Sequence, residues 1–114
     1  ATMVTPEMAR TIAMALPQTE EGSHHGTPAF RVRGRLFARL REDGTMAVRV
    51  DPGYRDVLVQ AGPDRFFVTP HYRDYPWMLV RLEAVGPQEL DDLLADAWAE
   101  VAPKRLAATL LATA

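Results

Sequence analysis

The residues best able to do chemistry in this 114-residue chain are arginines that alternate with apolar residues in its first half. Successive side chains of a strand point to opposite faces of its sheet, so a spacing of two gathers side chains on one face. A guanidinium group binds phosphate through two parallel hydrogen bonds, so such a face suggests an anionic partner. The spacing places on this face, around the ring of Phe37, the residues Arg31, Arg33, Arg35, Arg39, Arg41 and Arg49.

Two interpretations of this arginine face are open. In the first, the face contacts the phosphates of DNA, which gives salt-dependent affinity with little sequence information. In the second, it is a solvated surface balanced by nearby acids such as Glu42, Asp43 and Asp51. The net charge of −2 argues against a general nucleic-acid binder, but acids concentrate between positions 83 and 100, so a local positive field can exist elsewhere. The DNA hypothesis assigns the phosphate contacts to Arg33, Arg35, Arg39, Arg41 and Arg49.

The second candidate site is the segment 69–77, in which three aromatic residues, a histidine and an arginine stand close together. Loops on a rigid scaffold carry much of a protein's recognition, and aromatic rings line many small-molecule pockets. The alternative hypothesis is therefore a binding module for a small aromatic or anionic ligand, such as a metabolite or an antibiotic. The same rings could instead pack onto the sheet edge and leave no cavity. The ligand hypothesis assigns the contacts to Arg39, His71, Tyr72, Arg73 and Trp77.

The sequence supports neither catalysis nor metal binding. The chain has no cysteine, and Ser23 lacks the glycine-flanked turn of a hydrolase nucleophile. His24 and His25 are adjacent, so in a strand they point to opposite sides, and His71 would join them only if the fold brought the loops together. We therefore expect a protein that is not an enzyme and has no cofactor and no metal site.

The elements that must position these residues follow an α+β order. Thr5 and Pro6 begin a helix that stops at Pro17, and residues 18–26 are expected to form a loop. Alternation with a period of two over residues 29–51 predicts three antiparallel strands. The remaining expected elements are a helix over 52–61 that carries Tyr54, Val57, Leu58 and Ala61, strands near 66–68 and 77–84, a long helix over 87–101 and a short helix after 103.

This order predicts a single domain over residues 1–114, with an antiparallel sheet of about five strands and helices packed on one face. No apolar run is long enough to cross a membrane and no signal pattern is present, so we expect a cytoplasmic domain without membrane contact. Nothing in the sequence indicates an oligomeric state. The predicted core consists of Ile12, Phe30, Val32, Leu36, Leu40, Val48, Val50, Leu58, Val80, Leu82, Leu93, Leu94 and Trp98.

Several short segments, taken in their order and spacing, resemble the MmcQ/YjbR family along nearly the whole chain. The resemblance implies a CyaY-like α+β fold and DNA binding through a double-wing surface. The chain departs from the family at Ala97-Trp98, where a Ser-Tyr pair is frequent, and its first helix lacks the acids with which frataxin-like proteins bind iron. The segments that carry the resemblance are Glu20-Glu21, Gly26-Thr27-Pro28-Ala29-Phe30, Val32-Arg33-Gly34-Arg35-Leu36-Phe37-Ala38, Phe67-Val68-Thr69-Pro70-His71-Tyr72 and Pro76-Trp77.

The two functional hypotheses predict different surfaces. A pocket of roughly a few hundred Å³ beside Trp77 would favour the small-ligand hypothesis. A flat basic face would favour DNA binding, because phosphates along a duplex are contacted from an extended surface.

Overall fold

The computed structural model describes residues 4–113, with side chains as far as residue 108. Its helices are α1 (Pro6–Met14), α2 (Pro52–Ala61), the short 3₁₀ helix η1 (Leu82–Ala84), α3 (Pro87–Val101) and α4 (Lys104–Thr113). Its strands are β1 (Thr19–His24), β2 (Thr27–Val32), β3 (Arg35–Leu40), β4 (Thr45–Arg49), β5 (Phe66–Phe67) and β6 (Trp77–Arg81).

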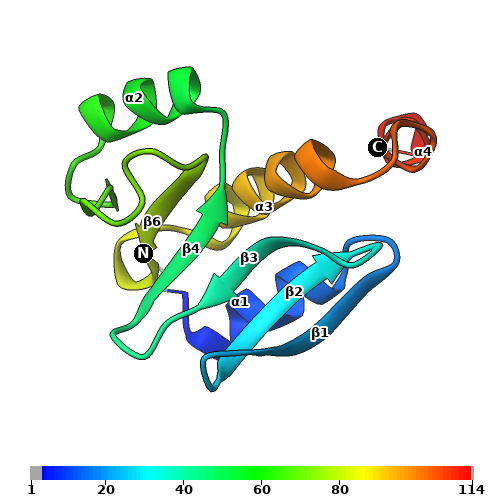
Figure 1. Cartoon of the computed structure of the whole chain (residues 1–114), viewed down its shortest axis with the longest axis horizontal. Helices are drawn as coiled ribbons and strands as arrows, with labels where there is room; N and C mark the ends of the chain where they lie inside the picture. Colours follow the sequence, from blue (N-terminus) through cyan, green and yellow to red (C-terminus); the bar gives the residue numbers. More distant parts are fainter. Residues whose placement is uncertain (1–3, 114) are drawn as a thin grey trace.

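The strands form one antiparallel sheet in the order β1-β2-β3-β4-β6-β5. Helix α1 packs on β1 and β2, α3 packs on β3 and β4, and the two helices contact each other (Figure 1). We call the side covered by α1 and α3 the helical face and the opposite side the outer face. The fold is thus the single α+β domain that the sequence predicts, with six strands where about five were expected. Within residues 4–113, no helix has the length and apolar content to cross a membrane.

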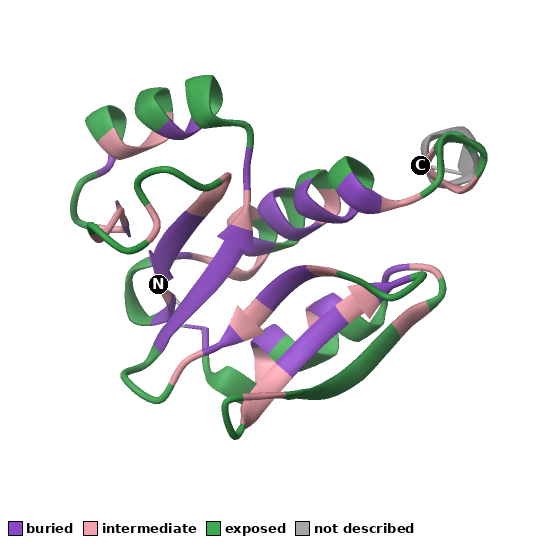
Figure 2. Ribbon diagram, in the orientation of Figure 1, coloured by how far each residue is buried: buried purple, intermediate pink, exposed green. Residues whose placement is uncertain are grey.

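The additional strand is β1, in a segment expected to be a loop. Its residues lack apolar alternation because β1 is an edge strand that is largely exposed to water (Figure 2). It is held by pairing with β2, from Thr19 opposite Val32 to His24 opposite Thr27. An ion pair between Glu21 and Arg10 of α1 also fastens it. The period-two signal therefore fails here because it requires one face of the strand to be buried.

The core lies between the sheet and the helices α1 and α3, and its largest fully buried side chain is Trp98. The indole Nε1 of Trp98 donates a hydrogen bond to the carbonyl oxygen of Pro17 at 3.0 Å, so the one polar atom of this ring is paired. Ile12 and Leu58 are only partly buried at the margin of the core. The predicted core residues confirmed as buried are Phe30, Val32, Leu40, Val48, Val50, Val80, Leu82, Leu93, Leu94 and Trp98.

The prediction for the start of β3 is wrong, because the pairing of β2 with β3 shifts register. Phe30 lies opposite Ala38, but Arg31 lies opposite Leu36, which leaves Phe37 as an extra residue in β3. Such a β-bulge turns the residues before it to the other face of the sheet. Phe37 is therefore fully buried in the core, whereas Leu36 lies on the outer face and is only half-buried.

Of the apolar residues expected on α2, only Leu58 packs against the core. The helix begins as expected, with Asp51 Oδ2 accepting a hydrogen bond from the backbone N–H of Tyr54 at 3.1 Å. Tyr54 and Val57 are exposed, however, and the buried residue of α2 is Arg55. The helix lies at the β5–β6 end of the sheet, where loop backbone rather than apolar side chains packs against Arg55.

Candidate ligand-binding site on the outer face

The outer face carries a cavity of about 190 Å³, which we call the outer pocket. Three separate segments form it: the turn between β1 and β2, the middle of the sheet, and the segment 69–77. Its sheet floor includes Ala47, which pairs with Arg39 of the neighbouring strand. The lining residues are His24, His25, Leu36, Arg39, Ala47, His71, Tyr72 and Trp77.

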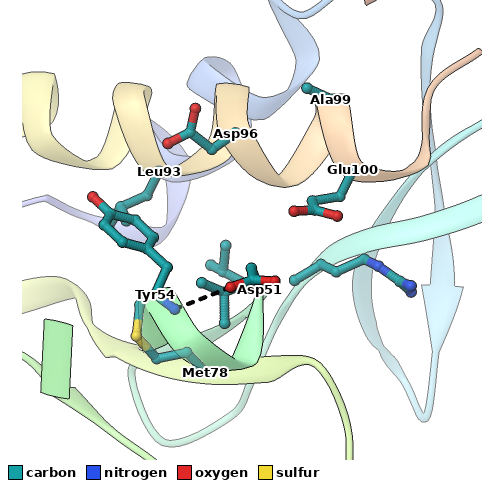
Figure 3. A pocket seen from close by; sticks show the side chains of 10 residues that line it. Asp51, Tyr54, Met78, Leu93, Asp96, Ala99 and Glu100 are labelled. Atoms are coloured by element: carbon teal, nitrogen blue, oxygen red, sulfur yellow. Dashed lines mark hydrogen bonds between the residues drawn. The ribbon is translucent and has the colours of Figure 1, made fainter. Parts of the chain in front are cut away.

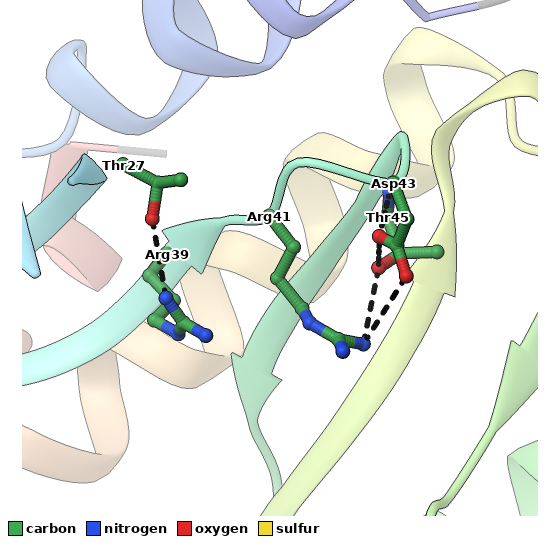
Figure 4. A network of polar contacts seen from close by, with 5 residues as sticks. All are labelled: Thr27, Arg39, Arg41, Asp43 and Thr45. Carbon is green, nitrogen blue, oxygen red and sulfur yellow. Dashed lines mark hydrogen bonds and ion pairs between the residues drawn. The ribbon is translucent and has the colours of Figure 1, made fainter. Parts of the chain in front are cut away.

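Arg39 is the cationic residue of the outer pocket, and it is half-buried. Its Nη1 atom donates to the carbonyl oxygen of His24 at 3.3 Å and to Oγ1 of Thr27 at 3.1 Å (Figure 4). Both acceptors lie at the turn between β1 and β2, so this turn fixes the orientation of the guanidinium. Within residues 4–113, the Nε and Nη2 atoms of Arg39 have no protein acceptor and no carboxylate pairs with it. That edge of the guanidinium has the geometry that binds a carboxylate or a phosphate through two hydrogen bonds.

Beside the outer pocket is a shallower hollow of about 340 Å³, which shares His25 and Arg39 with it. Arg41 lines this hollow but is partly neutralised by Asp43, with 3.6 Å between Nη1 and Oδ2 (Figure 4). Asp43 also accepts hydrogen bonds from the backbone N–H and the hydroxyl of Thr45, at 3.1 and 2.6 Å. The hydrogen bonds from Thr45 and the charge of Arg41 lower the pKa of Asp43. Arg41 is therefore a weaker anion-binding group than Arg39.

The wall formed by the segment 69–77 is held in place by Arg55. Its Nη1 donates to the carbonyl oxygens of Tyr72, Tyr75 and Trp77 at 3.3, 2.6 and 3.1 Å, and its Nη2 donates to that of Arg73 at 3.0 Å. Arg55 is 7% exposed and forms no ion pair among residues 4–113, so these carbonyls compensate for much of its burial, while its buried Nε has no acceptor among the described residues. A charged residue with this role was missed, since nothing in the sequence distinguishes Arg55 from a solvated arginine.

Three histidines line the outer pocket, because the fold brings the β1–β2 turn close to the segment 69–77. The rings of His24 and His25 are 4.3 Å apart, and that of His71 is 4.8 Å from Tyr72, both in edge-on geometry. Partial desolvation, together with the neighbouring His25, Arg39 and Arg31, lowers the pKa of His24 below 6.5. Within the described part of the chain, no three histidine or carboxylate side chains are placed to ligate one metal ion.

The structure separates the five arginines assigned to DNA contacts. Arg33 lies in the β2–β3 turn, where its φ of 52° is left-handed and its Nε donates to Gln18. Arg35 lies on the helical face, opposite Val32, and donates to the carbonyl oxygen of Val101 at 3.3 Å. Its assignment to the outer face is therefore wrong, as is that of Phe37, because both predictions ignored the bulge. Arg49 lines another cavity, and only Arg39 and Arg41 share a hollow.

Of the five residues assigned to a small ligand, four lie together in the outer pocket: Arg39, His71, Tyr72 and Trp77. Arg73 is exposed outside it and contributes a carbonyl oxygen to Arg55. The histidines His24 and His25 were missing from that assignment. Their position at the pocket depends on the β1–β2 turn, in which His25 and Gly26 both have positive φ, at 54° and 81°. A Gly after a polar residue is typical of such a turn, so His25-Gly26 was an available signal for the hairpin.

Comparison with known proteins places the chain in a family. The YjbR family model matches residues 14–100. Uncharacterized proteins of Mycobacterium bovis (Mb2600) and Mycobacterium tuberculosis (Rv2570) are each 40% identical over 68 residues, which cover 59% of this chain and 53% of each relative. The chain thus spans about half the length of these relatives.

A solved structure has the same fold. The crystal structure of the Deinococcus radiodurans protein DR2400, a DUF419 domain, superposes with a TM-score of 0.74 at 26% sequence identity. The match covers 87% of this chain and 79% of that one. Since the family model covers most of the sequence and the motifs described above lie largely within it, the chain belongs to the YjbR family.

Proposed function

We propose that this domain binds a small anionic ligand that carries an aromatic ring, with the ring in the outer pocket and the anionic group on Arg39. The observation that carries the proposal is the free Nε–Nη2 edge of Arg39, held by the β1–β2 turn at the mouth of a cavity with aromatic walls. An arginine fixed before binding loses little conformational entropy when the ligand arrives, which favours affinity.

The shape and chemistry of the outer pocket support a ligand with a single ring. A volume of about 190 Å³ is too small for a drug-sized molecule, whose pockets begin near 300 Å³, but it accommodates a benzene ring. Tyr72 and Trp77 present aromatic surface to such a ring, and Leu36 and Ala47 provide an apolar floor. A substituent on the ring would extend into the neighbouring hollow of about 340 Å³.

Calorimetric titration of the whole chain with benzoate tests this proposal, and benzamide serves as the neutral ligand of the same shape. We expect benzoate to bind with a stoichiometry of one and benzamide to bind much more weakly. Hydrogen bonds to a charged group contribute about 1.5–3 kcal/mol, so Arg39→Gln should weaken benzoate binding at least roughly tenfold. Arg33→Gln, at the tip of the β2–β3 hairpin, is the matched control and should bind as the wild type does. Equal affinity for benzoate and benzamide, or an unaffected Arg39→Gln variant, would overturn the proposal.

DNA binding is a second candidate, because Arg39 and Arg41 line an open polar hollow. It is tested by titrating duplex and single-stranded oligonucleotides at about 50 and 200 mM salt, where phosphate contacts produce a steep loss of affinity. DNA binding predicts that the Arg39→Gln/Arg41→Gln double variant loses affinity and salt dependence together. Benzoate binding with no salt-sensitive DNA binding would leave the small-ligand proposal alone.

A further inference from the structure

A cavity larger than the outer pocket lies elsewhere in the fold. It lies between the end of β4, the start of α2 and the C-terminal half of α3, and has a volume of about 500 Å³. We call it the α3 cavity. This volume lies within the range of about 300–1,000 Å³ that is typical of sites for small organic molecules. Of the residues that the sequence hypotheses assign to DNA or to a small ligand, it includes only Arg49.

The base of the α3 cavity is apolar. Val48 of β4 and Met78 of β6 face each other across the strand pair on the helical face, and Leu93 of α3 closes the cavity from above (Figure 3). All three side chains are buried in the core, at 1%, 0% and 7% exposure. The ring of Tyr54, by contrast, is an exposed wall of the cavity. The three buried side chains keep little accessible surface, so the apolar contact open to a ligand comes mainly from Tyr54 and Ala99, which are exposed and line the cavity.

The rim of the α3 cavity is acidic. Asp96 and Glu100 stand four residues apart on α3, so they lie on one face of that helix, and both carboxylates border the cavity (Figure 3). Neither makes a hydrogen bond or an ion pair within residues 4–113. A third acid, Asp51, caps α2 and also lines the cavity, against the single cation Arg49. Asp96 is exposed, but partial desolvation and the nearby Asp92 raise its pKa.

We propose that the α3 cavity is a second binding site, specific for an amphipathic organic cation such as a primary amine attached to an aromatic or alkyl group. The apolar part of the ligand packs on Leu93, Ala99 and the ring of Tyr54, and the ammonium group lies between Asp96 and Glu100. The ring of Tyr54 is placed to contact the cation as well.

An organic cation fits the α3 cavity better than a metal ion does. A hard metal ion needs several oxygen ligands converging on one point, and no such group of three side chains exists among the described residues. An apolar base also contributes nothing to a bare ion, whereas it stabilises a ligand in proportion to the apolar area that it buries. The proposal is independent of the anion site, because the two cavities share no lining residue.

The test is a calorimetric titration of the whole chain with 2-phenylethylamine, which is charged at neutral pH. The comparison ligands are 2-phenylethanol, which is neutral, and 3-phenylpropionate, which is anionic. We expect the amine alone to bind in the α3 cavity. Asp96→Asn/Glu100→Gln should weaken amine binding at least roughly tenfold, since it removes both charges without changing the size of the side chains. Asp91→Asn, on the exposed side of the same helix, is the control and should leave amine binding unchanged.

A second variant tests the location without altering charge. Ala99 lines the cavity from an exposed position on α3, so Ala99→Phe fills the space without disturbing the core. It should reduce amine binding while the midpoint of urea unfolding stays close to that of the wild type. Equal binding of the amine and the alcohol, no amine binding at millimolar concentration, or wild-type affinity in both variants would each overturn the proposal.

Discussion

The outer pocket and the α3 cavity lie on opposite faces of the same sheet and use neighbouring residues of the same strands. Ala47 of β4 and Trp77 of β6 line the outer pocket, whereas the next residues, Val48 and Met78, line the α3 cavity. The alternation of side chains along a strand is what separates the two sites. One short sheet can thus present a basic, histidine-rich site on one face and an acidic site on the other.

The two cavities also differ in how they are built. The α3 cavity is bordered by regular elements, namely the strands β4 and β6 and the helices α2 and α3. The outer pocket depends on two irregular segments, each tied by a guanidinium group to backbone carbonyls: Arg39 holds the β1–β2 turn and Arg55 holds the segment 69–77. We therefore expect single substitutions of arginine to disrupt the outer pocket far more than the α3 cavity.

The largest effect is expected from Arg55→Met, which keeps much of the side-chain volume and removes every hydrogen bond to the segment 69–77. The free energy of unfolding should fall by about 2–4 kcal/mol, because several carbonyls lose a charged donor at once. Urea denaturation measures this loss. Arg55→Lys should recover only part of it, since an ammonium group cannot reach carbonyls spread around a planar guanidinium. A loss below about 0.5 kcal/mol, typical of a surface substitution, would show that Arg55 does not hold the loop.

Trp77→Leu is expected to have the next largest effect, on binding rather than on folding. It removes an aromatic wall of the outer pocket, so benzoate affinity should fall by roughly three- to tenfold. Tryptophan fluorescence provides the measurement, because the other tryptophan, Trp98, is fully buried in the core. Benzoate should change the emission of the wild type and leave that of the Trp77→Leu variant unaltered. A persisting change in the variant would place the ligand away from Trp77.

Asp43→Ala should make the surroundings of the outer pocket more positive, and so more different from the acidic α3 cavity, because it removes an acid from the hollow beside Arg39. Loss of the two hydrogen bonds from Thr45 should reduce the free energy of unfolding by about 1 kcal/mol at neutral pH. The pKa of Asp43 is lowered in the folded state, so its contribution is present above the ordinary value of 3.8 and is lost as pH falls through the lower folded value. The stability of wild type and variant should therefore converge in acid. Benzoate affinity should rise slightly in the variant, and a decrease would contradict this account.

The smallest expected effect is an opposite response of the two sites to pH. The pKa of His24 is lowered below 6.5, so this residue gains charge only in mild acid and then attracts a bound anion. The pKa of Asp96 is raised above 3.8, so Asp96 begins to lose charge as acid is added. Between pH 7 and pH 5 we expect benzoate affinity to rise and amine affinity to fall, each slightly.

Measuring both affinities at the two pH values, with His24→Asn as the control for benzoate, checks this prediction. Protonation of His24 is expected to strengthen anion binding but to lower the free energy of unfolding. Because its pKa is lower in the folded chain, protonation of His24 favours the unfolded chain as pH falls below 6.5. Parallel pH responses of the two sites would contradict the assignment of opposite charge to them.

The features that could be predicted from the sequence are those fixed by neighbouring residues. The cap of α1 at Thr5 and that of α2 at Asp51 depend on side chains that reach only the next turn of helix. The strands β2, β3 and β4 were recognised from alternation, and so was most of the core, because a buried face repeats every second residue. The aromatic wall of the outer pocket was predicted from composition, because aromatic residues are concentrated in residues 69–77.

The features that were missed depend on contacts between distant segments. The bulge at Phe37 arises from how β3 pairs with β2, and period-two counting cannot detect an extra residue within an apolar run. The burial of Arg55 requires backbone carbonyls from residues far along the chain. His24 and His71 line the same pocket only because β1 pairs with β2, and the polar sequence of β1 gave no strand signal. The α3 cavity was missed for a similar reason, since Asp96 and Glu100 are typical of a solvated helix face until β4 and α2 are placed beneath them.

The central claim is that the outer pocket, and not another part of the surface, binds an anion through Arg39. Two-dimensional amide spectra of the isotope-labelled chain, recorded during titration with benzoate, test it most directly. We expect chemical-shift changes confined to His24 and His25, Ala47, His71 and Tyr72, and the indole of Trp77, with Leu93, Asp96 and Glu100 unchanged. The same titration of Arg39→Gln should produce almost no change. Shifts centred on α3, or shifts at the outer pocket that persist in Arg39→Gln, would contradict the account.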